Sequence, residues 1–347
     1  MRKTLPLLCV ALLLSLLVPP GHADDRVAVF VLAGQSNMEG KAKDALWETG
    51  AASEETASLF VHLRTDDGWR VRDDVFIRFL DRHGPLTLGY GSPGRTGVEL
   101  EFGTVVGDAF DQPVLLIKTA WGGHSLYRKF RPPSAGVPEE RVAADLQKAI
   151  DRTARDNEKH GRADAPPPVA ELRELYGSSY RALLAEVRET LADLDTLFPE
   201  LAGREPHLAG FVWFQGWNDQ YEGAETEYAA NLEHLIRDVR RDLEAPDLPF
   251  VIGVMGQNMS EPAAGPMQVI QQAQLAMPRV AGFEGTVRAV PTDVLVDRAA
   301  EALYPTWRED TAAWERVGSD HPYHYLGSAI WHLRMGRAFG EAMLELQ

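Results

Sequence analysis

The residues best suited to chemistry gather in four short blocks of the sequence. The blocks read GQSNM at 34–38, WGGHSL at 121–126, WFQGWND at 213–219 and SDHPYHYLG at 319–327. Together they supply serine hydroxyls, paired glycines, neutral amide side chains, and two histidines beside an aspartate. A serine becomes a nucleophile when a histidine accepts its proton and an acid fixes the tautomer of that histidine. The blocks therefore indicate nucleophilic catalysis by a serine.

Ser36, in the first block, is the candidate nucleophile. It follows the apolar run 27–33, which predicts a strand, and then Gly34, which permits a tight turn. A serine just past the carboxyl end of a parallel strand lies where open α/β sheets bind ligands. The alternative is that Ser36 is the N-cap of a helix that begins near Met38, because serine is a preferred cap. The block also differs from the G-x-S-x-G elbow of α/β-hydrolases, since Met38 replaces the second glycine.

The second and third blocks contain candidate donors for an oxyanion. Gly122 and Gly123 let the backbone approach whatever lies beside Ser36, so an amide of this pair is one candidate. A simple turn after a strand is the other interpretation of these glycines. Gln215 and Asn218 are neutral side chains that can donate to an oxyanion without titrating.

Asp320, His321 and His324 are the candidate acid and bases of the fourth block. The chain has ten histidines, so a histidine near an acid means little by itself. These three side chains also suggest a metal site, but Pro322 between the histidines disfavours ligand geometry on a helix. We therefore expect neither a metal nor another cofactor.

The elements that must position these blocks follow from apolar patterns. Near-continuous apolar runs, typical of strands in a covered parallel sheet, lie at 27–33, 114–120, 208–214, 250–255 and, more weakly, 287–290. Apolar residues at helical spacing predict helices over 180–197, 225–243 and 326–346. Alternating strands and helices favour a doubly wound α/β domain, in which blocks that follow strands meet at one edge of the sheet.

Two segments do not fit this alternation. Residues 89–94 read GYGSPG and match G-x-G-x-x-G, but no clear strand precedes them and no helix follows directly. The dinucleotide-binding motif needs that context, so nucleotide binding is disfavoured. Residues 131–206 are long for one crossover and polar in their first part. We interpret them as an insertion in a single domain over 24–347.

Residues 1–23 have the pattern of a secretory signal peptide. A basic start precedes an apolar core over 5–18, and small residues precede a cleavage site before Asp24. The core is short for a membrane span, which takes about 20 residues, although an uncleaved anchor is the alternative. The pattern predicts a secreted or periplasmic protein. No other segment is long and apolar enough to cross a membrane.

Charge and cysteine content exclude several classes of protein. The chain has 51 acidic side chains against 35 lysines and arginines, a net charge of −16, which argues against a nucleic-acid partner. Removing Arg2 and Lys3 with the leader changes the charge from −16 to −18. The single cysteine, Cys9, lies within the leader. A disulfide framework and a cysteine-based zinc site are therefore excluded.

The four blocks, in this order, resemble the SGNH (GDSL-type) hydrolase superfamily, and more closely its carbohydrate esterase family 6 and sialate O-acetylesterase-like branch. They span the chain from Val27 to about Phe339, apart from the insertion. The resemblance implies a three-layer α/β/α sandwich with a mainly parallel, flavodoxin-like sheet. It also implies an acetylated carbohydrate as substrate, hydrolysed through an acetyl-enzyme without a cofactor. The oligomeric state stays open.

The resemblance also implies roles for residues of the first three blocks. Ser36 is the nucleophile and its own amide is one oxyanion donor, with Gly122 or Gly123 as another. The branch usually has Q-G-E-x-D in the third block, which ranks Gln215 first as side-chain donor. The wider superfamily uses G-x-N-D, which also fits and makes Asn218 the second candidate.

The expected histidine block of this superfamily is D-x-x-H. His324 fits its aromatic context because Tyr325 follows it, and it ranks above His321, which has Gly318 where its acid should be. Asp320, however, stands four residues before His324 rather than three. Either Asp320 is the acid of a triad through a bulged turn, or the enzyme uses a Ser–His dyad.

Aromatic and basic side chains near the blocks are candidates for binding the sugar. The candidates are Trp121, Trp217, Tyr127 and Arg128, although each aromatic residue also fits the core. Trp217 stands where the branch usually has a glutamate. Arg95 and Arg131 are further candidates for an anionic group, but the acidic chain favours a neutral glycan. A glycan-binding module without activity, or a hydrolase of other esters, are the alternatives.

Overall fold

The computed structural model describes residues 25–347. The predicted leader, with Cys9 and the cleavage site, lies outside the described residues. Within them, the layers follow the alternation of strands and helices expected from the sequence.

A seven-stranded sheet forms the middle layer, in the order β11-β10-β9-β1-β8-β5-β6. The strands are β1 (Arg26–Gly34), β5 (Val75–Phe79), β6 (Arg82–Pro85), β8 (Val114–Ala120), β9 (Glu205–Phe214), β10 (Phe250–Val254) and β11 (Val287–Pro291). Neighbouring strands are parallel except for β5 and β6. All five predicted strands are present. β1 lies between β8 and β9, which brings the first three blocks together.

Two strands of this sheet were not predicted from the sequence. β5 has five residues and includes Arg78, whose guanidinium donates a hydrogen bond to Thr190. β6 is a short polar edge strand, RHGP, which pairs antiparallel with β5. Both lack the long apolar run that indicates a buried strand.

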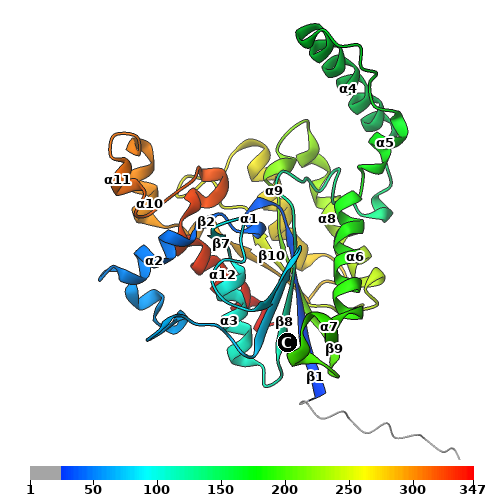
Figure 1. The fold of residues 1–347 in the computed structure, drawn as a ribbon. Helices are drawn as coiled ribbons and strands as arrows, with labels where there is room; N and C mark the ends of the chain where they lie inside the picture. Colours follow the sequence, from blue (N-terminus) through cyan, green and yellow to red (C-terminus); the bar gives the residue numbers. More distant parts are fainter. Residues whose placement is uncertain (1–24) are drawn as a thin grey trace, which may run out of the picture.

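Helices cover both faces of the sheet (Figure 1). Alternate residues of β1 point to opposite sides, so that Phe30 and Leu32 belong to one core and Val29 and Val31 to the other. The first core includes side chains from α2 (Asp44–Ala52), α3 (Glu99–Ala109) and α12 (Ala329–Leu344), and the second from α6 (Ser178–Ala192), α8 (Tyr228–Asp242) and α9 (Gly265–Ala276). The predicted three-layer α/β architecture with a mainly parallel sheet is confirmed.

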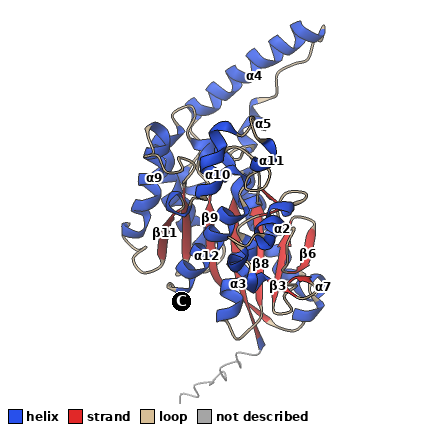
Figure 2. Cartoon of the chain, turned by 90° about the vertical axis from the view of Figure 1, so that its left-hand side faces the viewer, coloured by secondary structure: helices blue, strands red, loops and turns tan. Residues whose placement is uncertain are grey.

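The segment 131–206 has two parts with different roles. Its first part contains α4 (Glu139–His160), which projects from the body of the molecule, and α5 (Val169–Glu174) (Figures 1 and 2). Its second part contains α6 and α7 (Leu194–Leu197), and Leu183 of α6 is fully buried against the sheet. The part from α6 onward therefore belongs to the helical layer and is not inserted into it.

Further short elements lie outside the seven-stranded sheet. They are α1 (Ser36–Glu39), α10 (Arg298–Leu303), α11 (Thr311–Trp314) and the small strands β2 (Ala42–Lys43), β3 (Arg64–Thr65), β4 (Gly68–Trp69) and β7 (Arg95–Thr96). The terminal helix begins three residues later than predicted because Leu326 has φ 59°. The Ser328 hydroxyl caps this helix by accepting the amide of Trp331 at 3.2 Å.

Candidate active site

The first three blocks meet at one edge of the sheet. Gly34, at the end of β1, lies in register with Ala120 at the end of β8 and Phe214 at the end of β9. A side chain at Gly34 would place its Cβ 2.1 Å from the Phe214 carbonyl oxygen, so only glycine allows this close approach. Ser36 follows two residues later, as the first residue of α1.

Ser36, His324 and Asp320 form a connected set of side chains. The Ser36 Oγ lies 3.0 Å from His324 Nε2, and His324 Nδ1 lies 3.0 Å from Asp320 Oδ2. Asp320 thus fixes the tautomer that leaves Nε2 free to accept the hydroxyl proton. The arrangement has the hydrogen bonds that an activated serine requires.

The pKa of Asp320 reflects its neighbours. Burial by itself raises this pKa, but hydrogen bonds from His324 and from the His321 amide, together with the nearby charge of Arg95, lower it to about 2. The Arg95 Nη1 lies 3.3 Å from Asp320 Oδ2. The carboxylate is therefore charged throughout the pH range in which a histidine acts as a base.

A short turn, closed by the His324 amide donating to the His321 carbonyl at 2.9 Å, connects Asp320 to His324, and an irregular segment follows it. Tyr325 and Leu326, directly after His324, both have left-handed backbone conformations, with φ 52° and 59°. The fully buried Tyr325 anchors this turn, because its hydroxyl hydrogen-bonds Thr292 at 2.9 Å. The contact of Asp320 with His324 at 3.0 Å is the geometry that the triad alternative requires.

His321 points away from the serine. Its Nδ1 hydrogen-bonds the Tyr304 hydroxyl at 2.9 Å, whereas His324 faces Ser36. Because the two histidines diverge, they do not form a metal site with Asp320. Within residues 25–347, no group of three or more His, Cys, Asp or Glu side chains is placed to hold a metal ion.

Asn218 is oriented toward use as a donor. Its side-chain oxygen accepts a hydrogen bond from Gln35 Nε2 at 3.0 Å, which leaves the Nδ2 group available. Gln35 also accepts the amides of Gly216 and Asn218 through its Oε1, at 3.3 and 3.4 Å. The residue before the serine therefore holds the third block in place.

Gln215 is committed to structural hydrogen bonds. Its Nε2 donates to Asp219 Oδ2 at 2.6 Å and to the His124 carbonyl at 3.2 Å, and its Oε1 accepts from the Tyr228 hydroxyl. Asp219 in turn accepts the amides of residues 126 and 127 at 2.8 Å. The ranking of Gln215 ahead of Asn218 is therefore not supported, because both amide protons of Gln215 already have acceptors.

The two glycines of the second block differ in their hydrogen bonds. The Gly122 amide donates to the Glu39 carboxylate, so the expectation that it is free for an oxyanion is not supported. A Cβ at Gly122 would lie 3.7 Å from that of Ser36, which shows how closely this loop passes the serine. The amides of Gly123 and Ser36 have no acceptor within residues 25–347.

Three supporting residues of the site were not identified from the sequence. The Asn37 side chain donates to the Tyr323 carbonyl at 3.0 Å and so joins α1 to the turn that carries the histidine. Lys118 of β8 donates to the Glu39 carbonyl at 2.8 Å and pairs with Glu99 at 3.0 Å, with both side chains fully buried. Asn37 is next to Ser36 in the sequence, which is the only local feature that could have identified it. The partners of these side chains come from distant segments, which sequence spacing does not reveal.

The aromatic candidates for sugar binding differ in their surroundings. Trp217 faces Tyr323, with ring centroids 5.9 Å apart, and so lies beside the turn that carries the histidine. Trp121 stacks on His124 with centroids 6.2 Å apart. Tyr127 faces the guanidinium of Arg141 at 5.4 Å, toward the projecting segment. Trp217 is thus the one of these three with a contact to the turn that carries His324.

The candidate arginines are all paired with acids. The pairs are Arg95 with Asp320, Arg128 with Asp145 and Arg131 with Glu227. An anionic sugar would have to compete with these carboxylates.

Solved structures that are similar to this chain share little sequence with it. A protein from Arabidopsis thaliana is 14% identical, with 91% of this chain and 97% of that chain covered and a TM-score of 0.47. A carbohydrate acetylesterase from Xanthomonas citri is 13% identical, with 91% and 55% covered and a TM-score of 0.44. NanS is 16% identical, with 78% of each chain covered and a TM-score of 0.42.

The family comparison covers most of the chain. No curated protein matches the sequence. A family model described as carbohydrate esterase, sialic acid-specific acetylesterase, matches residues 26–295. The match includes the first three blocks, whereas Asp320 and His324 lie beyond it. Since the match spans well over half of the sequence, the chain belongs to this family of carbohydrate esterases.

Proposed function

We propose that the protein is a secreted carbohydrate O-acetylesterase that uses Ser36 as its nucleophile. The observation that carries this proposal is the contact of Ser36 Oγ with His324 Nε2 at 3.0 Å, with Asp320 on the other ring nitrogen. Membership of the carbohydrate esterase family supports the acetyl ester of a sugar as the substrate.

The reaction has two steps. In the first, His324 Nε2 takes the Ser36 proton while the serine oxygen attacks the acetyl carbonyl carbon. The tetrahedral intermediate then collapses, the bond to the sugar oxygen breaks, and His324 gives its proton to that oxygen. In the second step, His324 takes a proton from water, which attacks the acetyl-enzyme. Acetate leaves as the serine oxygen regains a proton.

The oxyanion of each intermediate needs donors that are free before the reaction. The amides of Ser36 and Gly123 have no acceptor within the described residues, and Gln35 holds the Asn218 side chain by its oxygen. We assign the oxyanion hole to these three donors. Preorganised donors of this kind stabilise the transition state more than the ground state.

Replacing Asn218 tests this assignment. We expect Asn218→Ala to lower kcat by about 10²–10³-fold with little change in KM, because one oxyanion donor is lost. Steady-state kinetics with an aryl acetate measure the effect. Gln220→Ala is the matched control, because this nearby amide donates to the Trp217 carbonyl at 3.2 Å.

The same experiment separates Asn218 from Gln215. We expect Gln215→Ala to lower thermal stability, because the buried Asp219 carboxylate loses a donor. Normal kcat in Asn218→Ala, together with a large fall of kcat in folded Gln215→Ala, would return the role to Gln215.

Release of acetate from defined sugars tests the substrate class. The panel contains acetylated xylan, O-acetylated sialic acids and acetylated pectin. We expect acetate from at least one of them at a rate above that of buffer. If all three are inert while an aryl acetate is cleaved, the protein hydrolyses another kind of ester.

Export is the second part of the proposal. It rests on the basic, apolar and small residues of positions 1–23. Residues 25–347 contain no helix that is long and apolar enough to cross a membrane. N-terminal sequencing of the exported protein is expected to begin at Asp24. A protein that keeps its first 23 residues would contradict cleavage.

A further inference from the structure

A cavity opens on the far side of Asp320 from the catalytic serine. It encloses about 300 Å³ and is lined by Arg95, Tyr304, Trp307, Trp314, Asp320 and His321, among others. Three of these aromatic residues come from the segment of α10 and α11, which the sequence blocks do not include. The cavity shares Asp320 with the catalytic set and therefore borders it.

Aromatic rings connect this cavity to the catalytic histidine. The centroid of Trp307 lies 6.4 Å from that of His321, which lies 5.3 Å from that of Tyr323. Tyr323 contacts His324 edge to face at 4.5 Å and Trp217 at 5.9 Å. The four rings of Trp307, His321, Tyr323 and Trp217, here called the aromatic row, therefore form a chain of contacts that meets the catalytic histidine at Tyr323.

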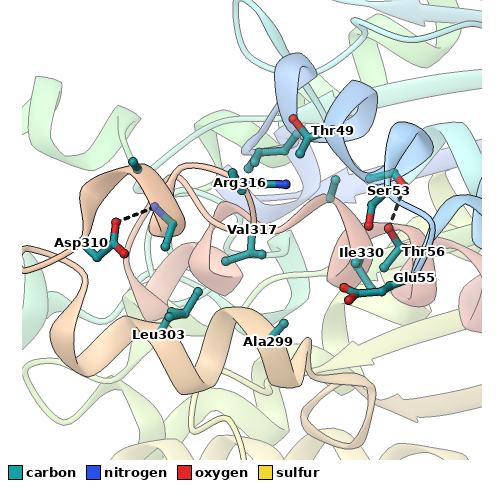
Figure 3. A pocket seen from close by; sticks show the side chains of 15 residues that line it. Thr49, Ser53, Glu55, Thr56, Ala299, Leu303, Asp310, Arg316, Val317 and Ile330 are labelled. Carbon is teal, nitrogen blue, oxygen red and sulfur yellow. Dashed lines mark hydrogen bonds between the residues drawn. The ribbon is translucent and has the colours of Figure 1, made fainter.

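The cavity wall is built rigidly. The Tyr304 hydroxyl bonds His321 at 2.9 Å, and its ring packs against Trp314, which is 5% exposed. Asp310 caps α11 by accepting the amide of Ala313 at 2.9 Å (Figure 3). Because these groups are already fixed, a ligand that stacks on the wall loses little by ordering it.

The opposite side of this segment faces a different cavity. That cavity encloses about 520 Å³ between α2 and the segment of α10 and α11, and Leu303 and Val317 line it (Figure 3). Its lining does not include Ser36, Asp320 or His324. The segment thus turns Trp307 toward the active site and its aliphatic side chains away from it.

Polar groups of the cavity suit a sugar. Within the described residues, the Arg95 guanidinium hydrogen-bonds through Nη1, to the Lys41 carbonyl at 2.6 Å and to Asp320 at 3.3 Å. Its other N–H groups remain available for hydroxyl or ring oxygens. Flat aromatic faces beside hydrogen-bond donors match the apolar face and the hydroxyls of a pyranose.

We propose that this cavity is a subsite for a second sugar of the substrate, which stacks on Trp307 while the acetylated sugar lies at Ser36. The inference rests on the proposed esterase function and extends it. The enzyme then acts on acetyl groups of a glycan chain in preference to acetylated monosaccharides. A glycan chain along the aromatic row would pass Tyr323, the ring that packs against the catalytic histidine.

Trp307→Ala tests the subsite. Each member of the acetylated sugar panel is assayed as an oligosaccharide and as the corresponding monosaccharide. We expect KM for the oligosaccharide to rise about tenfold, the loss of one stacking contact. The kcat and KM for the monosaccharide and for an aryl acetate should stay within about twofold. Trp307→Phe, which keeps an aromatic face, should recover most of the affinity.

Trp69→Ala is the matched control. Both tryptophans are partly exposed and carry an arginine over the ring, Arg308 at 4.7 Å and Arg64 at 4.9 Å. Trp69 packs in the cluster with Trp47 and Phe60, which is separate from the aromatic row. The control should leave the KM for the oligosaccharide unchanged.

The possible outcomes distinguish the subsite from the esterase function. An unchanged KM for the oligosaccharide in folded Trp307→Ala would overturn the subsite. A wild-type enzyme that deacetylates only monosaccharides would also overturn it and would leave the esterase function intact. If Trp307→Ala loses aryl acetate hydrolysis as much as it loses oligosaccharide hydrolysis, Trp307 supports the fold and is not part of a sugar subsite. An enzyme without esterase activity on any substrate would contradict the proposed function itself.

Discussion

The Ser36→Ala variant is expected to lose nearly all turnover, with kcat reduced by about 10⁶-fold. The hydroxyl is the group that forms the acetyl-enzyme, and neither His324 nor the oxyanion donors replace it. The residual rate should come from the oxyanion hole and from substrate binding. Steady-state kinetics with an aryl acetate, at enzyme concentrations high enough to detect slow turnover, measure the effect.

Ser125→Ala is the control for this variant. Ser125 and Ser36 are both 6% exposed, and Ser125 lies in the neighbouring WGGHSL block. Its hydroxyl makes no contact with His324, so we expect normal kinetics. Wild-type rates in folded Ser36→Ala would contradict the assignment of the nucleophile.

An organophosphate distinguishes an esterase from a glycan-binding module on the same fold. A serine activated by a histidine reacts with such a reagent much faster than an ordinary serine hydroxyl does. We expect the wild type to be labelled at Ser36 and inactivated, and His324→Ala to be labelled slowly. A wild-type protein without accelerated labelling would favour the binding module.

The parts of the fold predicted from the sequence are those whose environment is uniform. β1, β8, β9 and β10 contain apolar runs because both faces of a central parallel strand are buried, and β11, at the edge, has the weaker pattern. β6 was not predicted because it is a polar strand at the edge of the sheet, and β5, between β8 and β6, was not predicted because its five residues include Arg78. The terminal helix began late for a related reason. The left-handed residues before it, Tyr325 and Leu326, are fixed by the hydrogen bond of the Tyr325 hydroxyl to Thr292, which is 33 positions away.

The same holds for the active site, where roles that depend on contacts between distant segments could not be predicted from the sequence. Ser36 was a candidate because a serine just past a predicted strand lies where such sheets bind ligands, whereas His324 was ranked above His321 through the family resemblance. The choice between Gln215 and Asn218 depends on hydrogen bonds that sequence spacing does not reveal. Asp219 accepts a hydrogen bond from the Gln215 side-chain amide, and Gln35 orients the side-chain amide of Asn218.

Trp307 illustrates the same limit for substrate binding. It lies in a segment without a recognisable block, 17 residues before His324. It belongs to the aromatic row because the fold returns α10 and α11 to the turn that carries the histidine. No local pattern distinguishes such a tryptophan from one in the core.

Asp320→Asn is expected to lower kcat by about 10⁴-fold, if the site works as a triad. The asparagine presents an amide to the ring and no longer stabilises the charged histidine that forms when the serine proton is taken. It also loses the negative charge that faces Arg95 at 3.3 Å. The measurement is kcat for an aryl acetate between about pH 6 and 9.

The pH profile of the wild type provides a second test of the same residue. The pKa of Asp320 is about 2, lowered by His324, the His321 amide and Arg95 against the opposing effect of burial. A carboxyl with a lowered pKa keeps its charge as the pH falls, until the pH approaches that pKa. The acid limb of kcat/KM above about pH 3 should therefore have a slope of one, from a single proton. A slope of two would show that a second group titrates in this range, either Asp320 or Asp219, whose pKa burial raises to about 6.

Asp297→Asn is the control that distinguishes the loss of a catalytic carboxylate from the loss of a structural carboxylate. Asp297 is 3% exposed and accepts the Ser328 hydroxyl at 2.6 Å, so its replacement also changes a buried carboxylate near the catalytic turn. We expect Asp297→Asn to lower the melting temperature while kcat stays close to wild type. Asp320→Asn should do the reverse, with a large fall of kcat in a folded protein. If kcat of Asp320→Asn stays within about tenfold of wild type, the histidine needs no charged partner and the enzyme works as a Ser–His dyad.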